Sequence, residues 1–456
     1  MNRRLNAGGL LPRADRFVVA VALLSIIGCS PDEIPLVSTG PLDDLEKIPQ
    51  DATAFAETGG SPILQVDGRR LGEFEDYWYG PWERTEPEVC TAEEFGWAAE
   101  SFPKQSIFGP NLLEVSTSYV EAVTANAQLS QYPSRAAYGI TVRNTSMRAL
   151  PSTDPFFHDF RKAGEGYPFD YNQNSAVWAG TPLFLSHISR DGRFFAAESP
   201  YTCGWIDSGD IAYVDEEFVA KFRSANLAAI RRDRIPISSN EGGFLFLGRI
   251  GMILPMAARA ESEVSLLAPV ADVRHRALLT GVSLLDRDAA PFPLPFSEDQ
   301  LAQVINEILG QPYGWGGLGG YRDCSSTILD VFLPFALPLP RNSRKQAGAG
   351  RNVIIEKLSL SEKRERIVTT AVPFRTILNL SGHNMLYLGT FAGSPVAFHT
   401  IWGLRTESTD ESQSGRYLIG KSVITSLSPG SEISSLSRTR GDLLSRISSF
   451  TLLGEQ

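Results

Sequence analysis

The spacing of apolar residues changes several times along the chain, and each pattern predicts a different kind of element. At the start, residues 17–28 (FVVAVALLSIIG) carry no charge and follow Arg3, Arg4, Arg13 and Arg16. A helix needs about 20 apolar residues to span a bilayer, so this run is too short for a transmembrane helix. A basic lead before a short apolar run predicts a secretory signal, and a buried core helix is the alternative.

The next segments have weaker patterns. Residues 30–47 (SPDEIPLVSTGPLDDLEK) are rich in Pro, Asp and Ser without periodicity, which predicts a tether. Residues 48–132 are mixed, with the aromatic-rich FEDYWYGPWER and the helical NLLEVSTSYVEAVTANAQL. We expect Trp78 and Trp82 to pack in a core, and a sugar-binding surface is the alternative.

From residue 133 the pattern becomes one of short strands. GTPLFLSHISR and GRFFAAES alternate or run apolar around turns such as RDGR, and GGFLFLGRIGMILPMAARAESEVSLLAPV repeats the arrangement. Two small β-barrels, over residues 133–215 and 216–290, fit this spacing.

After residue 291 the pattern becomes helical. SEDQ predicts a capping box with Ser297 as N-cap and Gln300 three residues later, and Gly310 ends the helix. DCSSTILDVFLPFAL predicts a second helix, with Cys324 in its first turn and on its apolar face. The apolar face of the first helix comprises Leu301, Val304, Ile305, Ile308 and Leu309.

Composition narrows the possible partners. The chain has 456 residues, 43% of them hydrophobic, and a formal charge of −10, which suits two to four domains with real cores. No basic stripe is present, and EKRER at 362–366 is expected to be a solvated face, so nucleic acid is excluded as a partner.

The chain has four cysteines, Cys29, Cys90, Cys203 and Cys324, and the question is which of them pair and which stay free. Exported proteins tend to pair their cysteines. Because Cys90 and Cys203 fall in different predicted domains, we expect two buried thiols, with a disulfide as the alternative. No CxxC pattern or Cys/His cluster occurs, so no metal or other cofactor is predicted. Cys324 is left as the candidate nucleophile.

The surroundings of Cys324 favour chemistry over packing. A run with five glycines, YGWGGLGGYRDC, precedes it and would let a substrate backbone come close. A helix N-terminus favours negative charge, which predicts a lowered pKa for this thiol. A small buried thiol packing against a core is the alternative.

A base for the thiol is sought among five histidines. His158, His187 and His275 fall in the barrels and are expected to be surface or packing residues. HNMLYLG and VAFHTIW predict a hairpin, and reflecting it about residue 391 places His383 opposite His399, with Cβ atoms about 4.5–5.5 Å apart. One imidazole would then fix the tautomer of the other.

These motifs in this order (YGWGG, DCSS, RNS at 341–343, GHNMLYLG and AFHTIWG) resemble the NlpC-type family of bacterial cell-wall cysteine peptidases, which are papain-like. The resemblance covers about residues 295–405. The upstream chain is similar to the subfamily with an N-terminal stabilising segment and two bacterial SH3-like barrels. The implied fold is α+β: signal 1–28, tether 29–47, stabilising segment 48–132, barrels 133–215 and 216–290, and papain-like domain 291–456.

The resemblance also implies roles for individual residues. Cys324 is the nucleophile, His383 the base and His399 its orienting partner, and Tyr313 assists the oxyanion site beside the backbone N–H of Cys324. Asp323 would bind the free amine of a stem peptide. The D-glutamyl carboxylate would be held by Ser325 and Ser343. The first barrel supplies an acid and a Tyr to the amine pocket, for which Tyr201 is the candidate.

IIGC at residues 26–29 resembles the lipobox of bacterial lipoproteins. It implies that Cys29 carries lipid and begins the mature chain, and Ser30 implies sorting to the outer membrane, facing the periplasm. Residues 406–456 match no pattern.

The expected function is a lipid-anchored endopeptidase. It would hydrolyse the γ-D-glutamyl–L-diamino acid bond of peptidoglycan stem peptides through a thioester, with a preference for stems with a free N-terminal L-Ala. An amidase or acyltransferase on the same scaffold, and a peptidoglycan-binding lipoprotein without catalysis, are the alternatives. A thiol-redox protein is disfavoured because Cys324 has no resolving partner nearby.

Overall fold

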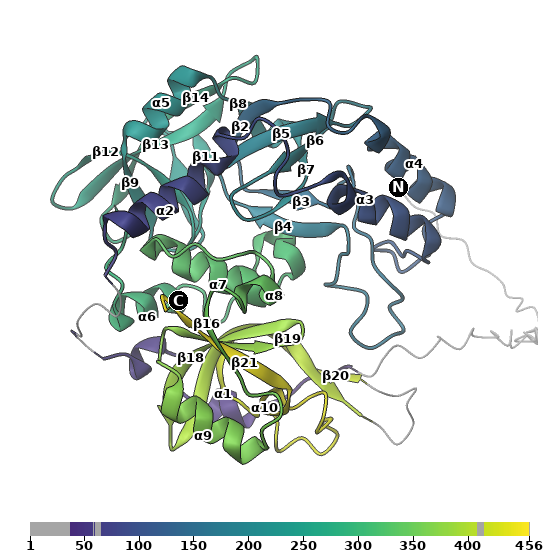
Figure 1. Ribbon diagram of the computed structural model, residues 1–456, viewed down its shortest axis with the longest axis vertical. Coiled ribbons are helices and arrows are strands. Elements are labelled where there is room, and N and C mark those ends of the chain that lie inside the picture. Colours follow the sequence, from purple (N-terminus) through teal and green to yellow (C-terminus); the bar gives the residue numbers. More distant parts are fainter. Residues whose placement is uncertain (1–36, 58, 60–64, 408–414, 456) are drawn as a thin grey trace, which may run out of the picture.

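The structure is a computed structural model that describes residues 37–57, 59, 65–407 and 415–455 (Figure 1). The predicted signal and Cys29 lie outside these residues. Within the described ranges, no helix is long and apolar enough to cross a membrane.

The N-terminal region after residue 65 is helical. Each of its three α-helices has a polar N-cap, Asp67, Thr91 or Ser116, whose side chain accepts a backbone N–H of the first turn. Trp78 and Trp82 are buried in a core shared with both SH3-like domains and the end of the catalytic helix region, as expected for packing residues. The helices are α2 (Gly68–Tyr79), α3 (Ala92–Ser101) and α4 (Thr117–Asn126), with short 3₁₀ turns η2 (Gly80–Trp82), η3 (Phe102–Lys104) and η4 (Leu129–Gln131).

The first SH3-like domain is a seven-stranded antiparallel sheet in the order β4-β3-β7-β6-β5-β2-β8. Its strands are β2 (Ala137–Thr141), β3 (Thr145–Arg148), β4 (Gln173–Val177), β5 (Pro182–Ile188), β6 (Phe194–Glu198), β7 (Cys203–Asp207) and β8 (Ile211–Tyr213), with η5 at Ser208–Asp210.

The second SH3-like domain has a five-stranded sheet, β14-β13-β12-β9-β15, and a separate hairpin, β10-β11. Its elements are α5 (Glu216–Ser224), β9 (Asn226–Ile230), β10 (Ile235–Ser238), β11 (Phe244–Gly248), β12 (Ile253–Arg259), β13 (Glu263–Ala271), β14 (Ala277–Leu285) and β15 (Ala289–Pro291).

The C-terminal papain-like domain is built on a seven-stranded sheet, β1-β20-β19-β18-β17-β21-β16. Figure 1 shows α7 between this sheet and the two SH3-like domains, and α9 on the far side of the sheet. The elements are α6 (Glu298–Asn306), η6 (Trp315–Gly320), α7 (Cys324–Phe332), η7 (Leu333–Phe335), α8 (Ser343–Gln346), β16 (Gly350–Ile354), α9 (Leu360–Thr370), β17 (Thr376–Leu380), β18 (His383–Phe391), β19 (Ser394–Thr406), β20 (Gly415–Ser426), α10 (Leu443–Arg446) and β21 (Ile447–Leu453).

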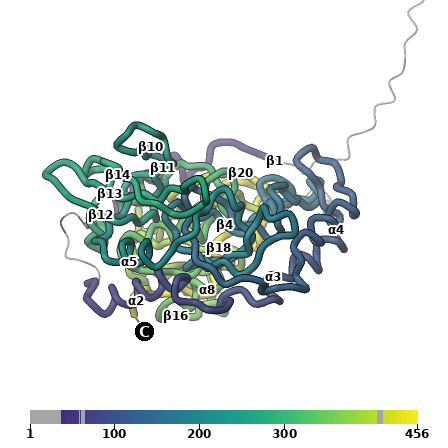
Figure 2. Tube along the Cα trace, turned by 90° about the horizontal axis from the view of Figure 1, so that it is seen from above, coloured from purple at the N-terminus to yellow at the C-terminus, as the bar shows by residue number. Residues whose placement is uncertain are grey.

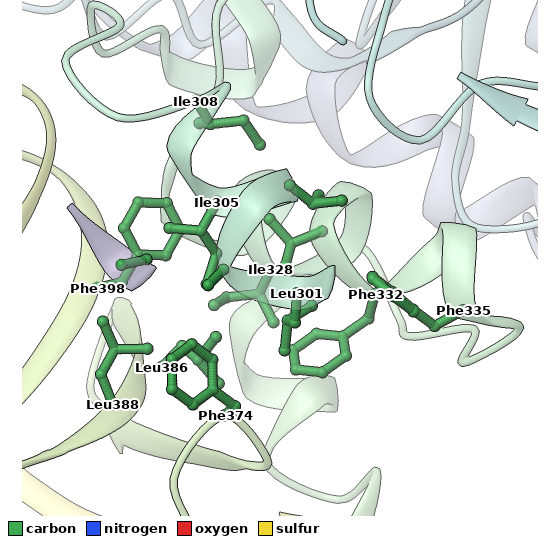
Figure 3. Close-up of a cluster of buried hydrophobic side chains, with 14 of the residues drawn as sticks. Leu301, Ile305, Ile308, Ile328, Phe332, Phe335, Phe374, Leu386, Leu388 and Phe398 are labelled. Atoms are coloured by element: carbon green, nitrogen blue, oxygen red, sulfur yellow. The ribbon is translucent and has the colours of Figure 1, made fainter. Parts of the chain in front are cut away.

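Helices α6 and α7 hold the catalytic domain together through one apolar cluster. Helix α6 ends at Asn306, earlier than the predicted stop at Gly310. Of the predicted apolar face, Leu309 is partly buried and the other four residues are buried, where they meet Ile328 and Phe332 of α7 and Leu386 and Phe398 of the sheet (Figure 3). Ser297 caps α6 by accepting the N–H of Gln300, but only half of the predicted capping box forms. The Gln300 side chain instead accepts from Arg231 of the second SH3-like domain.

Residues 37–47 do not form the tether that composition predicted. Strand β1 (Val37–Ser38) adds to the catalytic sheet parallel to β20, and Leu42 is buried beside it. Figure 2 shows β1 next to β20. After α1 (Asp43–Lys47), η1 (Ala52–Phe55) packs on α6. The pattern was too sparse to reveal this, because a two-residue strand leaves no periodicity.

The expectation of two separate thiols is wrong, because Cys90 and Cys203 form a disulfide that joins the N-terminal helices to β7. EKRER lies on α9 as the expected solvated face, since Glu362, Arg364, Glu365 and Arg366 are exposed. Lys363 differs from its neighbours because it is buried and donates to the carbonyls of Ser445 and Ile447.

Candidate active site

Cys324 begins α7, and the residue before it determines its position. Asp323 is the N-cap: its carboxylate accepts the N–H of Ser326, whose hydroxyl accepts the N–H of Asp323. Thr327 hydrogen-bonds through its hydroxyl to Thr400 of β19, at 2.6 Å, so the first turn of the helix is fixed to the sheet. The thiol is only 8% exposed.

The hairpin that carries the two histidines does not have the predicted register. Leu386 faces Phe398, whereas reflection about residue 391 would pair Phe398 with Asn384. A two-residue turn at Ala392 and Gly393, both with positive φ, and a bulge after Tyr387 move the register by two residues. A shift of two keeps side chains on the same face of a sheet, so His383 and His399 become diagonal neighbours.

The two imidazoles are hydrogen-bonded, and a third side chain orders them. His383 Nε2 lies 2.9 Å from His399 Nδ1, and His399 Nε2 lies 3.0 Å from the Thr425 hydroxyl. That hydroxyl donates its one hydrogen to the carbonyl of Ser426, so it can only accept from His399. His399 therefore carries its proton on Nε2 and accepts on Nδ1. His383 then donates from Nε2, which leaves its Nδ1 as a free base.

The sulfur of Cys324 lies against the backbone on either side of His383. The thiol points at the carbonyl oxygen of Gly382, 4.0 Å away, and the N–H of Asn384 hydrogen-bonds to the sulfur. The structure therefore places the thiol against the backbone on either side of His383, whose imidazole is hydrogen-bonded to His399.

The pKa of the Cys324 thiol is shifted in the opposite direction to the one that the sequence predicted. Burial, followed by the charge of Asp323, raises the pKa of Cys324 to about 12, although a helix N-terminus predicted a lowered value. Burial and then the nearby Arg446 lower the pKa of His383 to about 3. Burial and then the charge of His383 hold the pKa of His399 well below its ordinary value. At neutral pH the resting site therefore holds a neutral thiol and two neutral imidazoles.

Tyr313 lies at the edge of the site, where its ring packs against Phe169 and Trp402 with centroids 6.3 and 6.0 Å away. Burial and the charge of Asp323 hold its pKa well above the ordinary value, so the phenol stays protonated and can donate. The backbone N–H of Cys324, in the first turn of α7, has no intrahelical acceptor. Both groups can therefore serve an oxyanion.

Asp323 and Ser325, which the resemblance assigns to substrate, are both occupied by protein groups. The Asp323 carboxylate pairs with both terminal nitrogens of Arg341, at 2.7 and 3.1 Å. It also accepts from the N–H of Gly316 and from the Ser325 hydroxyl, which in turn accepts from Arg341. Although burial raises the Asp323 pKa, the charge of Arg341 keeps it below the ordinary value, so this carboxylate is ionised and paired.

Ser343, the third proposed substrate residue, begins α8. Its carbonyl accepts from the Asn384 side chain, which also donates to Gln346. The Ser343 hydroxyl makes no hydrogen bond to other described residues and is partly exposed. The Ser325 hydroxyl is already hydrogen-bonded to Asp323 and Arg341, so of the two serine hydroxyls only that of Ser343 is available to a ligand.

The glycine run packs against the first SH3-like domain. A Cβ on Gly316 would come within 2.4 Å of the Gln173 carbonyl oxygen, and one on Gly317 would come equally close to Ala176. Both glycines have positive φ, and Gln173 donates to the Gly316 carbonyl. These glycines let the loop contact β4. The sequence analysis had instead predicted that the glycine run allows a substrate backbone to come close.

The three remaining histidines and Tyr201 lie in or beside the SH3-like domains. His187 is buried and hydrogen-bonded to Ser134 and the Ala127 carbonyl, His158 stacks on Tyr171, and His275 sits in a turn with positive φ. Tyr201 packs where the first SH3-like domain meets the catalytic domain, and the charges of Asp330 and Arg341 act on its hydroxyl.

Taken together, a thiol at a helix N-terminus, packed against the strand that carries His383, and a second histidine bonded to His383 fit a papain-like cysteine-peptidase site. The whole chain supports the same class. Four family models match in succession: the NlpC/P60 N-terminal stabilising domain at 17–132, SH3 domains of the SH3b1 type at 155–207 and the SH3b2 type at 215–261, and the NlpC/P60 family at 310–392. The chain belongs to the NlpC/P60 family of peptidases.

One solved structure has the same architecture over most of the chain. An NlpC/P60 endopeptidase from Photobacterium damselae subsp. piscicida is 26% identical, with a TM-score of 0.80 over 92% of this chain and all of that one. An NlpC/P60 family protein from Bacillus cereus is 14% identical over 66% of this chain and 98% of that one, with a TM-score of 0.44. A search of curated proteins found no match.

Two residues at the site escaped sequence reasoning. Arg341 was visible as the first residue of the RNS motif, and an Asp before the nucleophile was a signal that it needed a partner. Thr425 gave no signal, because it lies in the C-terminal region that matched no pattern and meets His399 only across the β19–β20 pairing.

Proposed function

We propose that this protein is a cysteine endopeptidase that hydrolyses the γ-D-glutamyl–L-diamino acid bond of peptidoglycan stem peptides. The observation that carries the proposal is the ordered relay from Thr425 through His399 to His383, which leaves His383 Nδ1 without a proton, in the residue between the two backbone groups that contact Cys324. A purely structural thiol would need no such relay.

In the first half of the reaction, His383 Nδ1 takes the thiol proton while the sulfur attacks the γ-carbonyl carbon of D-glutamate. The oxygen becomes an oxyanion, which accepts from the Cys324 N–H and the Tyr313 hydroxyl. The protonated His383 then gives its proton to the leaving amine of the diamino acid, and a thioester remains on Cys324.

In the second half, water attacks the thioester as His383 takes one of its protons. The tetrahedral species collapses, the carboxylic acid leaves, and the sulfur recovers its proton from His383. His399 keeps the imidazole oriented and stabilises the imidazolium in both halves. The Ser343 hydroxyl donates to the α-carboxylate of D-glutamate, which requires no side-chain movement because this hydroxyl is available.

The test is to incubate the purified protein with defined muropeptides and to read the products by mass spectrometry. Cleavage at the γ-D-glutamyl bond, reduced about 10⁴-fold or more in Cys324→Ala, supports the proposal. Tight binding to wall sacculi without any cleavage would leave a peptidoglycan-binding protein instead. Cleavage at the sugar–peptide amide would indicate an amidase.

The proposal places the enzyme in the cell envelope, anchored to the outer membrane by lipid on Cys29. Supporting this are the basic lead, the short apolar run and the lipobox-like IIGC. Metabolic labelling with a fatty acid, followed by fractionation, tests it. Label that is present in the unaltered protein and lost in Cys29→Ser supports the anchor; an unlabelled protein excludes it.

A further inference from the structure

Four of the large apolar side chains that are exposed border one groove: Val37, Leu112, Leu113 and Tyr167. The groove lies where the N-terminal region, a loop of the first SH3-like domain at residues 159–167 and strands β19 and β20 meet, and its volume is about 580 Å³. Ligand sites commonly enclose about 300–1,000 Å³. Apolar side chains gathered around such a hollow and left in water indicate a binding site.

The groove is continuous with the active site through three aromatic rings. Trp402 of β19 lines the groove, and its ring centroid is 6.4 Å from that of Tyr167 and 6.0 Å from that of Tyr313. Trp402 follows His399 by three residues on the same strand, and none of the described residues that line the groove belongs to α7 or α8. The groove therefore borders the histidine side of the active site and not the side formed by these two helices.

Arg416 brings a positive charge without an ionic partner into this groove. It lies directly opposite Arg405 in the β19–β20 pairing, and like charges that face each other in this way repel. Neither guanidinium forms an ion pair with another described residue, and the Nε of Arg405 is buried without a hydrogen-bond partner. Burial and then the charges of Arg405 and Arg446 lower the pKa of Arg416. An anion bound here would relieve this repulsion.

The acids that line the groove do not neutralise Arg416. Asp159 already forms an ion pair with a neighbouring arginine at 2.9 Å. Glu165, whose charge acts on Arg416, contacts a tyrosine hydroxyl at 2.8 Å and a histidine nitrogen at 3.2 Å through one oxygen, and Glu114 is exposed to solvent. The groove therefore offers apolar and aromatic surface together with a cation, which suits a ligand that carries both an aliphatic part and a carboxylate.

We propose that this groove binds the leaving side of the stem peptide, which is the diamino acid and any residue after it, and that Arg416 binds a carboxylate there. The inference rests on the proposed function. His383 must protonate the amine of the diamino acid, so the leaving side lies towards the histidines, where the groove begins. The aliphatic part of the diamino acid packs on Trp402 while its carboxylate accepts charge-assisted hydrogen bonds from the guanidinium.

Two substrates that differ only in their leaving-side charge test the inference on the full-length protein. They are L-Ala-γ-D-Glu-diaminopimelate and the same tripeptide with both diaminopimelate carboxylates converted to carboxamides. We expect kcat/KM to be about tenfold higher for the acid form, because only a carboxylate forms charge-assisted hydrogen bonds with Arg416. A difference smaller than about threefold overturns the inference while the proposed function stands. Cleavage of neither substrate overturns the proposed function itself.

Variants of Arg416 locate the cause. Arg416→Met should lower the ratio of kcat/KM for the acid form to that for the amide form to about one, and Arg416→Lys, which keeps the charge, should retain part of it. Arg438→Met is the matched control, because Arg438 is exposed on the same domain and does not line the groove, and its ratio should not move. An unchanged ratio in a folded Arg416→Met protein removes the role given to Arg416. If that variant fails to fold, the two-substrate comparison on the unaltered protein still decides.

Discussion

Cys324 lies where two influences on its pKa oppose each other. The first turn of α7 favours the thiolate, as do the N–H groups of Asn384 and Ser325. Burial and the charge of Asp323 oppose it and prevail. The thiolate therefore forms only as His383 takes the proton, so the nucleophile is activated during the reaction and not at rest.

Alkylation with iodoacetamide checks this state of the thiol, in a protein with Cys29→Ser so that Cys324 is the only free thiol. Since the thiolate is the reacting form and the pKa is about 12, the rate should rise about tenfold per pH unit from pH 7 to 10. A rate that reaches a plateau below pH 7 would show a thiolate already present at rest.

Thr425 is a positioning residue that acts through His399. Thr425→Val removes the acceptor for the Nε2–H of His399, which lets the opposite tautomer form, and that tautomer cannot accept from His383. We expect kcat to fall about 10–100-fold with little change in KM. Thr425→Ser retains the hydroxyl and should recover most of the activity. Equal losses in both variants would point to packing and not to hydrogen bonding.

At the scale of elements, α7 is held by a buried charge cluster that spans three domains. Arg322 pairs with Asp233 at 2.8 Å and with Asp330 at 2.6 Å, and Trp178 of the first SH3-like domain donates to Asp330. Although burial raises it, the pKa of Asp233 falls to about 2 through the charge and hydrogen bonds of Arg322. The cluster therefore ties the start of the catalytic helix to both SH3-like domains.

Arg322→Met tests the cluster, because it leaves the buried Asp330 without a guanidinium and Asp233 with Arg249 alone. We expect the free energy of unfolding to fall by about 3–5 kcal/mol, measured by urea denaturation. Arg287→Met is the control: the Arg287 side chain is exposed and its pair with Asp288 is long, at 3.8 Å, so the change should stay within about 0.5 kcal/mol. Similar values for the two variants would mean that the cluster contributes no more than a surface pair.

At the scale of the molecule, the four domains form one connected unit. Residues 37–56 pack on the catalytic domain, α2 packs on the second SH3-like domain, and the Cys90–Cys203 disulfide holds the N-terminal helices to the first. The disulfide closes a long loop, with a sequence separation of 113, so it restricts the unfolded chain strongly. An oxidising compartment, as the signal predicts, would maintain it.

Reduction of this disulfide should lower the free energy of unfolding by about 2–5 kcal/mol. The measurement is urea unfolding with and without dithiothreitol, and the Cys90→Ala/Cys203→Ala double variant should match the reduced protein. Dithiothreitol should not alter the double variant further. No difference between oxidised and reduced protein would show that domain packing alone sets the stability.

Features that depend on residues close together in the sequence could be predicted from it. The α6 face, the start of α7, the packing of Trp78 and Trp82 and the order of domains all follow from spacing or motifs within short stretches. The register of the hairpin could not be predicted from the sequence, because the bulge and the two-residue turn depend on how β18 and β19 contact their neighbours. The histidines still came together because the error was an even number of residues.

By itself, the sequence determined the chemical groups and the elements that carry them: the thiol at a helix start, the two histidines on one hairpin face, and the family to which their motifs belong. Only the tertiary structure decided the Cys90–Cys203 pairing, the folding of residues 37–47 onto the sheet, the saturation of Asp323 by Arg341 and the ordering of the histidines by Thr425. The physical reason is the range of the interaction. Helix caps and periodic faces are made by residues a few positions apart, whereas charges, disulfides and hydrogen-bond relays join residues that only folding brings together.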